Sequence, residues 1–84
     1  MEKYTRELFG RVLKRKVVAR GNIQQIVYWA DNVYTYICNY EDKQFIDIVG
    51  SITMMTAGPE FEYSYEELEK IADDLIAGKV VKLS

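Results

Sequence analysis

Histidine is missing from this 84-residue chain, and cysteine, proline and glycine are scarce. Without histidine the chain has no Ser-His-Asp triad, no Cys-His pair and no imidazole that acts as a general base or a metal ligand. The single cysteine excludes an internal disulfide and a structural zinc site, and it indicates a reducing compartment. One proline and five glycines argue against disorder and low complexity.

Long apolar runs and phosphate-binding loops are absent as well. No apolar stretch approaches the roughly 18 residues that a membrane span needs, and the charged N-terminus does not resemble a signal peptide. The Gly21-Asn22 and Gly50-Ser51 pairs lack the spacing of a P-loop and its Lys-Ser/Thr. We therefore expect one cytoplasmic domain, residues 1–84, that is not an enzyme and holds no cofactor or metal.

Charge is distributed unevenly along the chain. Residues 1–20 carry seven basic and two acidic side chains, a local net charge of +5, whereas residues 21–84 carry four basic and eleven acidic side chains, a local net charge of −7. Asymmetry of this kind predicts either charged partners or halves that neutralise each other on folding.

Two amphipathic helices are predicted in the first half of the chain. In residues 2–19, apolar side chains from Tyr4 to Ala19 share one side of a 3.6-residue helix, and basic side chains share the other. Gly10 inside this segment disfavours a helix by about 1 kcal/mol relative to alanine. Asn22 is a suitable N-cap for a second, more apolar helix. Cys38 extends an apolar line of that helix, so we expect it to be buried.

The third segment has two interpretations. Asp42 is a suitable N-cap for a helix that carries Phe45, Ile48, Val49, Ile52 and Met55 and ends at Gly58-Pro59. Residues 33–37 and 45–49 are also rich in β-forming side chains, which is the pattern of a hairpin across residues 33–53. The apolar spacing fits a period of 3.6 better than 2, so a helix is favoured.

The fourth segment begins with a capping box. Ser64 and Glu67 have the spacing at which the hydroxyl accepts from the Glu67 N–H and the carboxylate accepts from the Ser64 N–H. Gly78 is the expected stop of this helix. The predicted fold is therefore all-α, a compact bundle of four helices, with an α+β fold containing the 33–53 hairpin as the alternative.

An acidic and aromatic stretch leads into the fourth helix and continues along it. Tyrosine is a frequent interface anchor, and clustered carboxylates accelerate the encounter with a basic partner. The same acidic residues would also favour the N-terminus of the helix. The predicted partner-binding residues are Glu60, Glu62, Tyr63, Tyr65, Glu66, Glu67, Glu69, Asp73 and Asp74. The predicted function is a non-catalytic protein-binding module for a basic protein.

Residues 58–76 resemble the acidic last helix and its lead-in in small helical immunity proteins of the colicin D immunity type, from bacterial toxin-immunity pairs. The length of the chain and its expected number of helices are also similar to those of this family. The resemblance implies a bacterial immunity protein or antitoxin whose carboxylates occupy the basic substrate cleft of a toxin nuclease.

Two other kinds of partner are considered. The basic first helix is the basis of an alternative function as a nucleic-acid-binding regulator, with Lys3, Arg11, Lys14 and Arg15 on phosphates. Glu7 interrupts that basic stripe, and the acidic fourth helix is able to neutralise it. A second apolar stripe in the second helix is a candidate surface for a homo-oligomer, formed by Trp29, Val33, Tyr36 and Tyr40.

Overall fold

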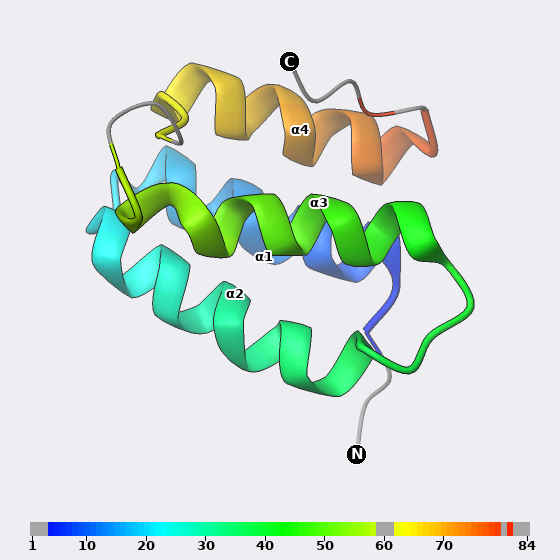
Figure 1. The fold of residues 1–84 in the computed structure, drawn as a ribbon. Helices are drawn as coiled ribbons and strands as arrows, with labels where there is room; N and C mark the ends of the chain where they lie inside the picture. Colours follow the sequence, from blue (N-terminus) through cyan, green and yellow to red (C-terminus); the bar gives the residue numbers. More distant parts are fainter. Residues whose placement is uncertain (1–3, 59–61, 80, 82–84) are drawn as a thin grey trace. The chain divides into compact units, whose positions relative to one another are not determined.

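The chain folds into four α-helices and one short 3-10 helix in a computed structural model, which describes residues 4–58, 62–79 and 81. The elements are α1 (Arg6–Val18), α2 (Ile23–Ile37), α3 (Lys43–Thr53), η1 (Met54–Thr56) and α4 (Tyr65–Ala77), shown in Figure 1. The described residues contain no strand. The all-α prediction of four helices is confirmed, and the alternative hairpin across residues 33–53 is wrong, because this stretch forms the end of α2 and the whole of α3.

The helices cluster into two compact units, one of Met1–Gly21 with Ser64–Ser84 and the other of Asn22–Tyr63. In the first unit, α1 and α4 pack as an antiparallel pair. Gly10, early in α1, approaches Ala72 and Ile76 near the end of α4, while Arg20, just after α1, lies over Tyr65 at the start of α4. The buried side chains of this unit include Phe9, Leu13, Val17, Leu68, Ile71 and Leu75.

In the second unit, α2 and α3 pack against each other as neighbours in sequence, running in opposite directions (Figure 1). Their buried positions recur every three or four residues, which places them on one stripe of each helix. These side chains are Ile26, Ala30, Val33 and Ile37 of α2 and Phe45, Ile48, Val49 and Ile52 of α3. The 3.6-residue period of the apolar side chains therefore predicts the correct structure for residues 33–53. The β-forming residues of this segment, taken alone, are typical of a hairpin.

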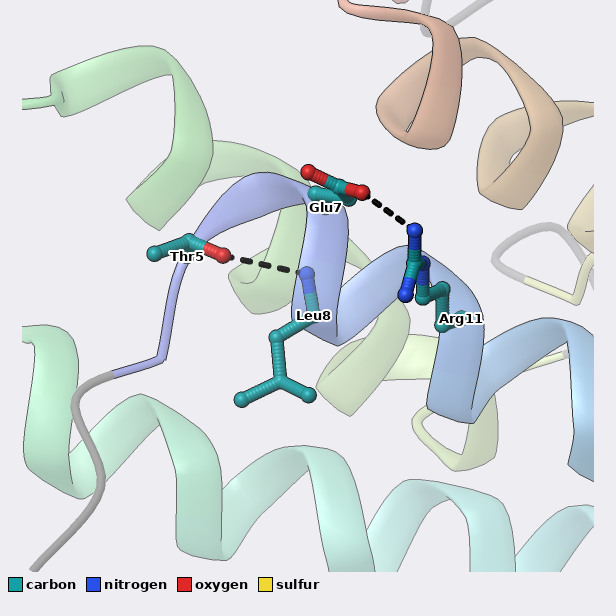
Figure 2. A network of polar contacts seen from close by, with 4 residues as sticks. All are labelled: Thr5, Glu7, Leu8 and Arg11. Carbon is teal, nitrogen blue, oxygen red and sulfur yellow. Dashed lines mark hydrogen bonds and ion pairs between the residues drawn. The ribbon is translucent and has the colours of Figure 1, made fainter.

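Side-chain caps begin every α-helix. The predicted N-caps Asn22, Asp42 and Ser64 are confirmed, each accepting a hydrogen bond from a backbone N–H in the first turn. The first helix begins at Arg6 rather than at residue 2, because the Thr5 hydroxyl accepts from the Leu8 N–H at 3.1 Å and caps it (Figure 2). Tyr4 therefore precedes the helix instead of contributing to its apolar side.

Two helix ends differ from expectation. Glycine is the usual left-handed residue after a helix, and Gly21 follows α1 closely, but the left-handed residue after the Ala19 C-cap is Arg20, with φ 55°. The N–H groups of Arg20 and Gly21 donate to Val17 O and Lys16 O, which is the Schellman arrangement with arginine where glycine is usual. Helix α2 ends at Ile37, so Cys38 lies beyond the last turn and is exposed, and the prediction of a buried Cys38 is wrong.

The helices range from 11 to 15 residues in length. Within the described residues, none combines the length and the apolar character that crossing a bilayer requires.

Candidate functional site

The predicted partner-binding residues follow the start and the outer side of α4. Glu62, Glu66, Glu67 and Asp73 are exposed, and Tyr63, Tyr65, Glu69 and Asp74 are partly buried. Glu60 lies outside the described residues. Several of these side chains make contacts within their own unit. The predicted residues therefore differ in how available they are to bind a partner.

Glu67 belongs to the capping box of α4. Its N–H donates to the Ser64 hydroxyl at 3.1 Å, and its carboxylate accepts from the Ser64 N–H at 3.0 Å. The predicted capping box is therefore confirmed. At the other end of α4, Gly78 adopts the left-handed conformation with φ 73° and is the predicted stop.

Removing this cap is expected to weaken α4. The Ser64→Ala variant should lower the free energy of unfolding by about 1 kcal/mol, because the Glu67 N–H loses its acceptor. Glu67→Gln serves as the matched control, because glutamine preserves the reciprocal bond to the Ser64 N–H and should change the stability much less. Urea unfolding followed by circular dichroism measures both. Equal losses in the two variants would contradict the assigned role of the hydroxyl.

Asp73 is partnered by a basic residue of α1. The Lys14 ammonium donates to the Asp73 carboxylate at 2.5 Å, with both side chains roughly half exposed. This hydrogen bond, with the negative charges of Asp73 and Glu69, raises the pKa of Lys14, and desolvation opposes the shift only in part. The pair is therefore present at neutral pH, and on the alkaline side it is lost as the pH rises through the pKa of Lys14. The predicted neutralisation between the opposed halves occurs at this pair.

Tyr65 links α4 to the end of α1. Its hydroxyl donates to the Gly21 carbonyl at 2.8 Å, and the Arg20 guanidinium lies 4.9 Å from the centre of its ring. A cation over a tyrosine ring at this distance contributes about 0.5–1 kcal/mol at a partly exposed site. Tyr65 thus stabilises the first unit, and one face of its ring is already covered.

Tyr63 also makes a hydrogen bond within its own unit, the second. It is partly buried, and its hydroxyl donates to Ser51 Oγ at 3.3 Å.

Two of the predicted acidic residues lack such partners among the described residues. Within the part of the chain that the structure describes, Glu62 and Glu66 are exposed and take part in no ion pair.

A pocket of about 140 Å³ in the first unit is lined in part by Glu66. Val17 and Val18 contribute an apolar wall from α1, Arg20 and Tyr65 form one side, and Glu66 and Glu69 supply two carboxylates. Val18 is 60% exposed although it is apolar. The sequence predicted Tyr65, Glu66 and Glu69, but it gave no sign of the two valines or of Arg20, because helical spacing does not reveal which residues of α1 adjoin the start of α4.

The basic residues of the alternative nucleic-acid surface are partly neutralised. Arg11 donates to the Glu7 carboxylate at 2.6 Å, one turn earlier in α1 (Figure 2), and Lys14 pairs with Asp73. Arg15 is exposed, and Lys3 lies outside the described residues. Because two of the three described members already have carboxylate partners, few positive charges remain here for phosphates.

The predicted homo-oligomer stripe does not form one exposed surface. Val33 is 1% exposed and belongs to the core, Trp29 and Tyr40 are partly buried, and Tyr36 is 55% exposed. The described residues also contain no group of three acidic or cysteine side chains placed to hold a metal ion.

Comparison with known proteins finds no relative, because no family model, no curated protein and no solved structure matches this chain.

Proposed function

We propose that this chain is a non-catalytic protein-binding module whose carboxylates bind a basic protein. The observation that carries the proposal is the exposed carboxylate of Glu66, which has no ion pair within the described residues. Glu66 also adjoins the pocket that contains Glu69. Unneutralised carboxylates attract a basic protein and orient it before contact.

The pocket suggests how such a partner is held. A lysine or arginine side chain has an apolar stem and a charged head. Its stem suits the wall formed by Val17 and Val18, and its head suits the carboxylates of Glu66 and Glu69. An arginine would be favoured over a lysine, because its planar guanidinium bonds two carboxylates at once.

An immunity protein or antitoxin is the specific form of this function that we propose. Such a protein inhibits a toxin by placing carboxylates where the toxin binds a negatively charged substrate. The resemblance of residues 58–76 to immunity proteins supports this form, as does the loss of positive charge from α1 through its ion pairs. We propose the bacterial cytoplasm as its setting.

The experiment uses the basic protein that co-purifies with the tagged chain, isolated and titrated against purified variants by calorimetry. The Glu66→Lys/Glu69→Lys variant is expected to weaken binding about 100-fold or more, because two attractive contacts become repulsive. The affinity of the unaltered chain should also fall as salt is added.

The matched control is Glu41→Lys/Asp47→Lys, which makes the same change in net charge at exposed residues of the second unit. This control should bind within a few-fold of the unaltered chain. Equal weakening by both variants would show a response to bulk charge alone. Unchanged binding by Glu66→Lys/Glu69→Lys would overturn the assigned surface. Circular dichroism confirms that each variant is folded.

A further inference from the structure

The outer face of α2 is almost uncharged, which sets it apart from the rest of this chain. Charged residues make up 29% of the sequence, yet the 15 residues of α2 include one, Asp31. Two of its tyrosines are among the most exposed large hydrophobic side chains of the described residues, Tyr28 at 72% and Tyr36 at 55%. Solvent-facing helix sides are ordinarily charged, so this composition requires an explanation.

The uncharged side chains fall on one continuous face. At 100° per residue, Gln24, Tyr28 and Thr35 lie in line, opposite the buried stripe of Ile26 and Val33. The exposed neutral residues of α2 and its C-terminal end that share or flank this line are Gln24, Gln25, Tyr28, Asn32, Thr35, Tyr36 and Asn39. Asp31 lies at one edge of the face. We call this set the neutral face.

Amides, hydroxyls and phenols suit an interface. Interface cores are poor in charge and rich in tyrosine, which offers contact area and a hydrogen bond at low entropic cost. Amide side chains carry a donor and an acceptor together, so an amide can pair with an identical amide. A surface built from such groups complements itself.

We infer that the neutral face binds the neutral face of a second copy of this chain, forming a two-fold symmetric dimer. In such a dimer the neutral face of one copy contacts the same face of the other copy. A charged residue at the centre would therefore lie against its own counterpart and be repelled by it. The seven residues of the neutral face avoid this repulsion, and Asp31 beside them is the one charged residue of α2. By contrast, a pairing through Glu66 and Glu69 would bring carboxylates together.

The sequence positions fit an antiparallel pair of α2 helices with the two-fold axis at Asn32. Tyr28 and Tyr36 lie four residues to either side of Asn32, so Tyr28 of each copy faces Tyr36 of the other. Asp31 of both copies then lies near the axis at the edge of the contact, where the two carboxylates repel. One helix face also buries less than the roughly 800 Å² per partner of a standard interface, so the dimer is weak and forms as the concentration rises.

Sedimentation equilibrium of the full chain, with reductant because Cys38 is exposed, tests the dimer. Over a range on the order of 10–500 µM, the average mass should rise from monomer towards dimer. Tyr28→Glu should weaken dimerisation at least about tenfold, because it places a like charge on each copy. Lys79→Gln, an equal change in charge at an exposed residue of the first unit, should leave it unchanged.

Asp31→Asn provides a test in the opposite direction, because removing the repulsion should strengthen the dimer about threefold to tenfold. Added salt should also strengthen dimerisation by screening the two Asp31 carboxylates, whereas it should weaken binding of a basic protein at Glu66 and Glu69. The opposite effects of salt therefore distinguish failure of the dimer from failure of the proposed function. A monomeric mass over the whole range, or equal dimerisation of Tyr28→Glu and the unaltered chain, would overturn the inference.

Discussion

Replacement of Gly10 by valine is expected to lower the free energy of unfolding by about 3 kcal/mol or more. A Cβ atom added at position 10 would lie 2.8 Å from the carbonyl oxygen of Ala72 and 3.0 Å from Leu75 Cβ and Ile76 Cγ1. The carbonyl belongs to the backbone of α4, so it cannot rotate aside as a side chain can. Any side chain at this position therefore forces α1 and α4 apart. A domain of this length has a total stability of only roughly 4–13 kcal/mol.

Alanine at the same position separates packing from helix propensity. Alanine favours a helix over glycine by about 1 kcal/mol, but the clash costs roughly 1–3 kcal/mol. The net result expected for Gly10→Ala is a loss of stability that is smaller than for valine.

Gly50→Ala is the matched control within α3. Its added Cβ would meet the ring edge of Tyr34 at 3.3 Å, and this partly exposed ring can shift. The control should be unchanged in stability or up to about 1 kcal/mol more stable. Urea unfolding followed by circular dichroism measures all three variants. An equal gain in Gly10→Ala and Gly50→Ala would show that α1 and α4 do not approach closely at Gly10.

The second large effect is expected at Phe45, which is 2% exposed in the core of the second unit. Phe45→Ala should lower the free energy of unfolding by about 3–5 kcal/mol, because it removes buried area and leaves a cavity. Phe45→Leu fills most of that volume and should cost about 1.5 kcal/mol or less. Similar losses in the two variants would contradict tight packing around the ring.

These two sites also test the predicted single domain, because Gly10 belongs to one unit and Phe45 to the other. Trp29 is the one tryptophan of the chain and lies in the second unit, so its fluorescence reports on that unit, whereas circular dichroism reports on both. In a single cooperative domain, both variants shift both signals together. If Gly10→Val left the fluorescence transition in place while lowering the dichroism transition, the prediction of one domain would be wrong.

Local signals in the sequence predicted where most helices begin and end. Asn22, Asp42 and Ser64 act through side-chain oxygens that reach backbone N–H groups two or three residues away. Gly78 acts through its own backbone freedom. Such interactions depend on neighbouring residues alone, which is why they can be recognised without a tertiary structure. Thr5 acts in the same way, but the apolar pattern that includes Tyr4 concealed it.

Contacts between distant residues were not predictable in the same way. From the sequence, Gly10 was interpreted only through its low helix propensity. In the structure, its lack of a side chain allows α4 to approach α1 closely. The acidic surface was predicted as a set of equivalent residues. The structure divides that set, because Asp73 pairs with Lys14 and Glu67 caps a helix, while Glu62 and Glu66 have no ion pair within the described residues.

Local patterns in the sequence are enough to predict that this chain is helical and where its apolar stripes lie, because caps and a 3.6-residue period are properties of a few consecutive residues. Tertiary structure alone decided which charges remain available to a partner. That outcome depends on which helix lies beside which, and the pairing of Lys14 with Asp73 joins residues 59 positions apart. The proposed binding surface is therefore the part of the negative charge that packing of α1 against α4 leaves unneutralised.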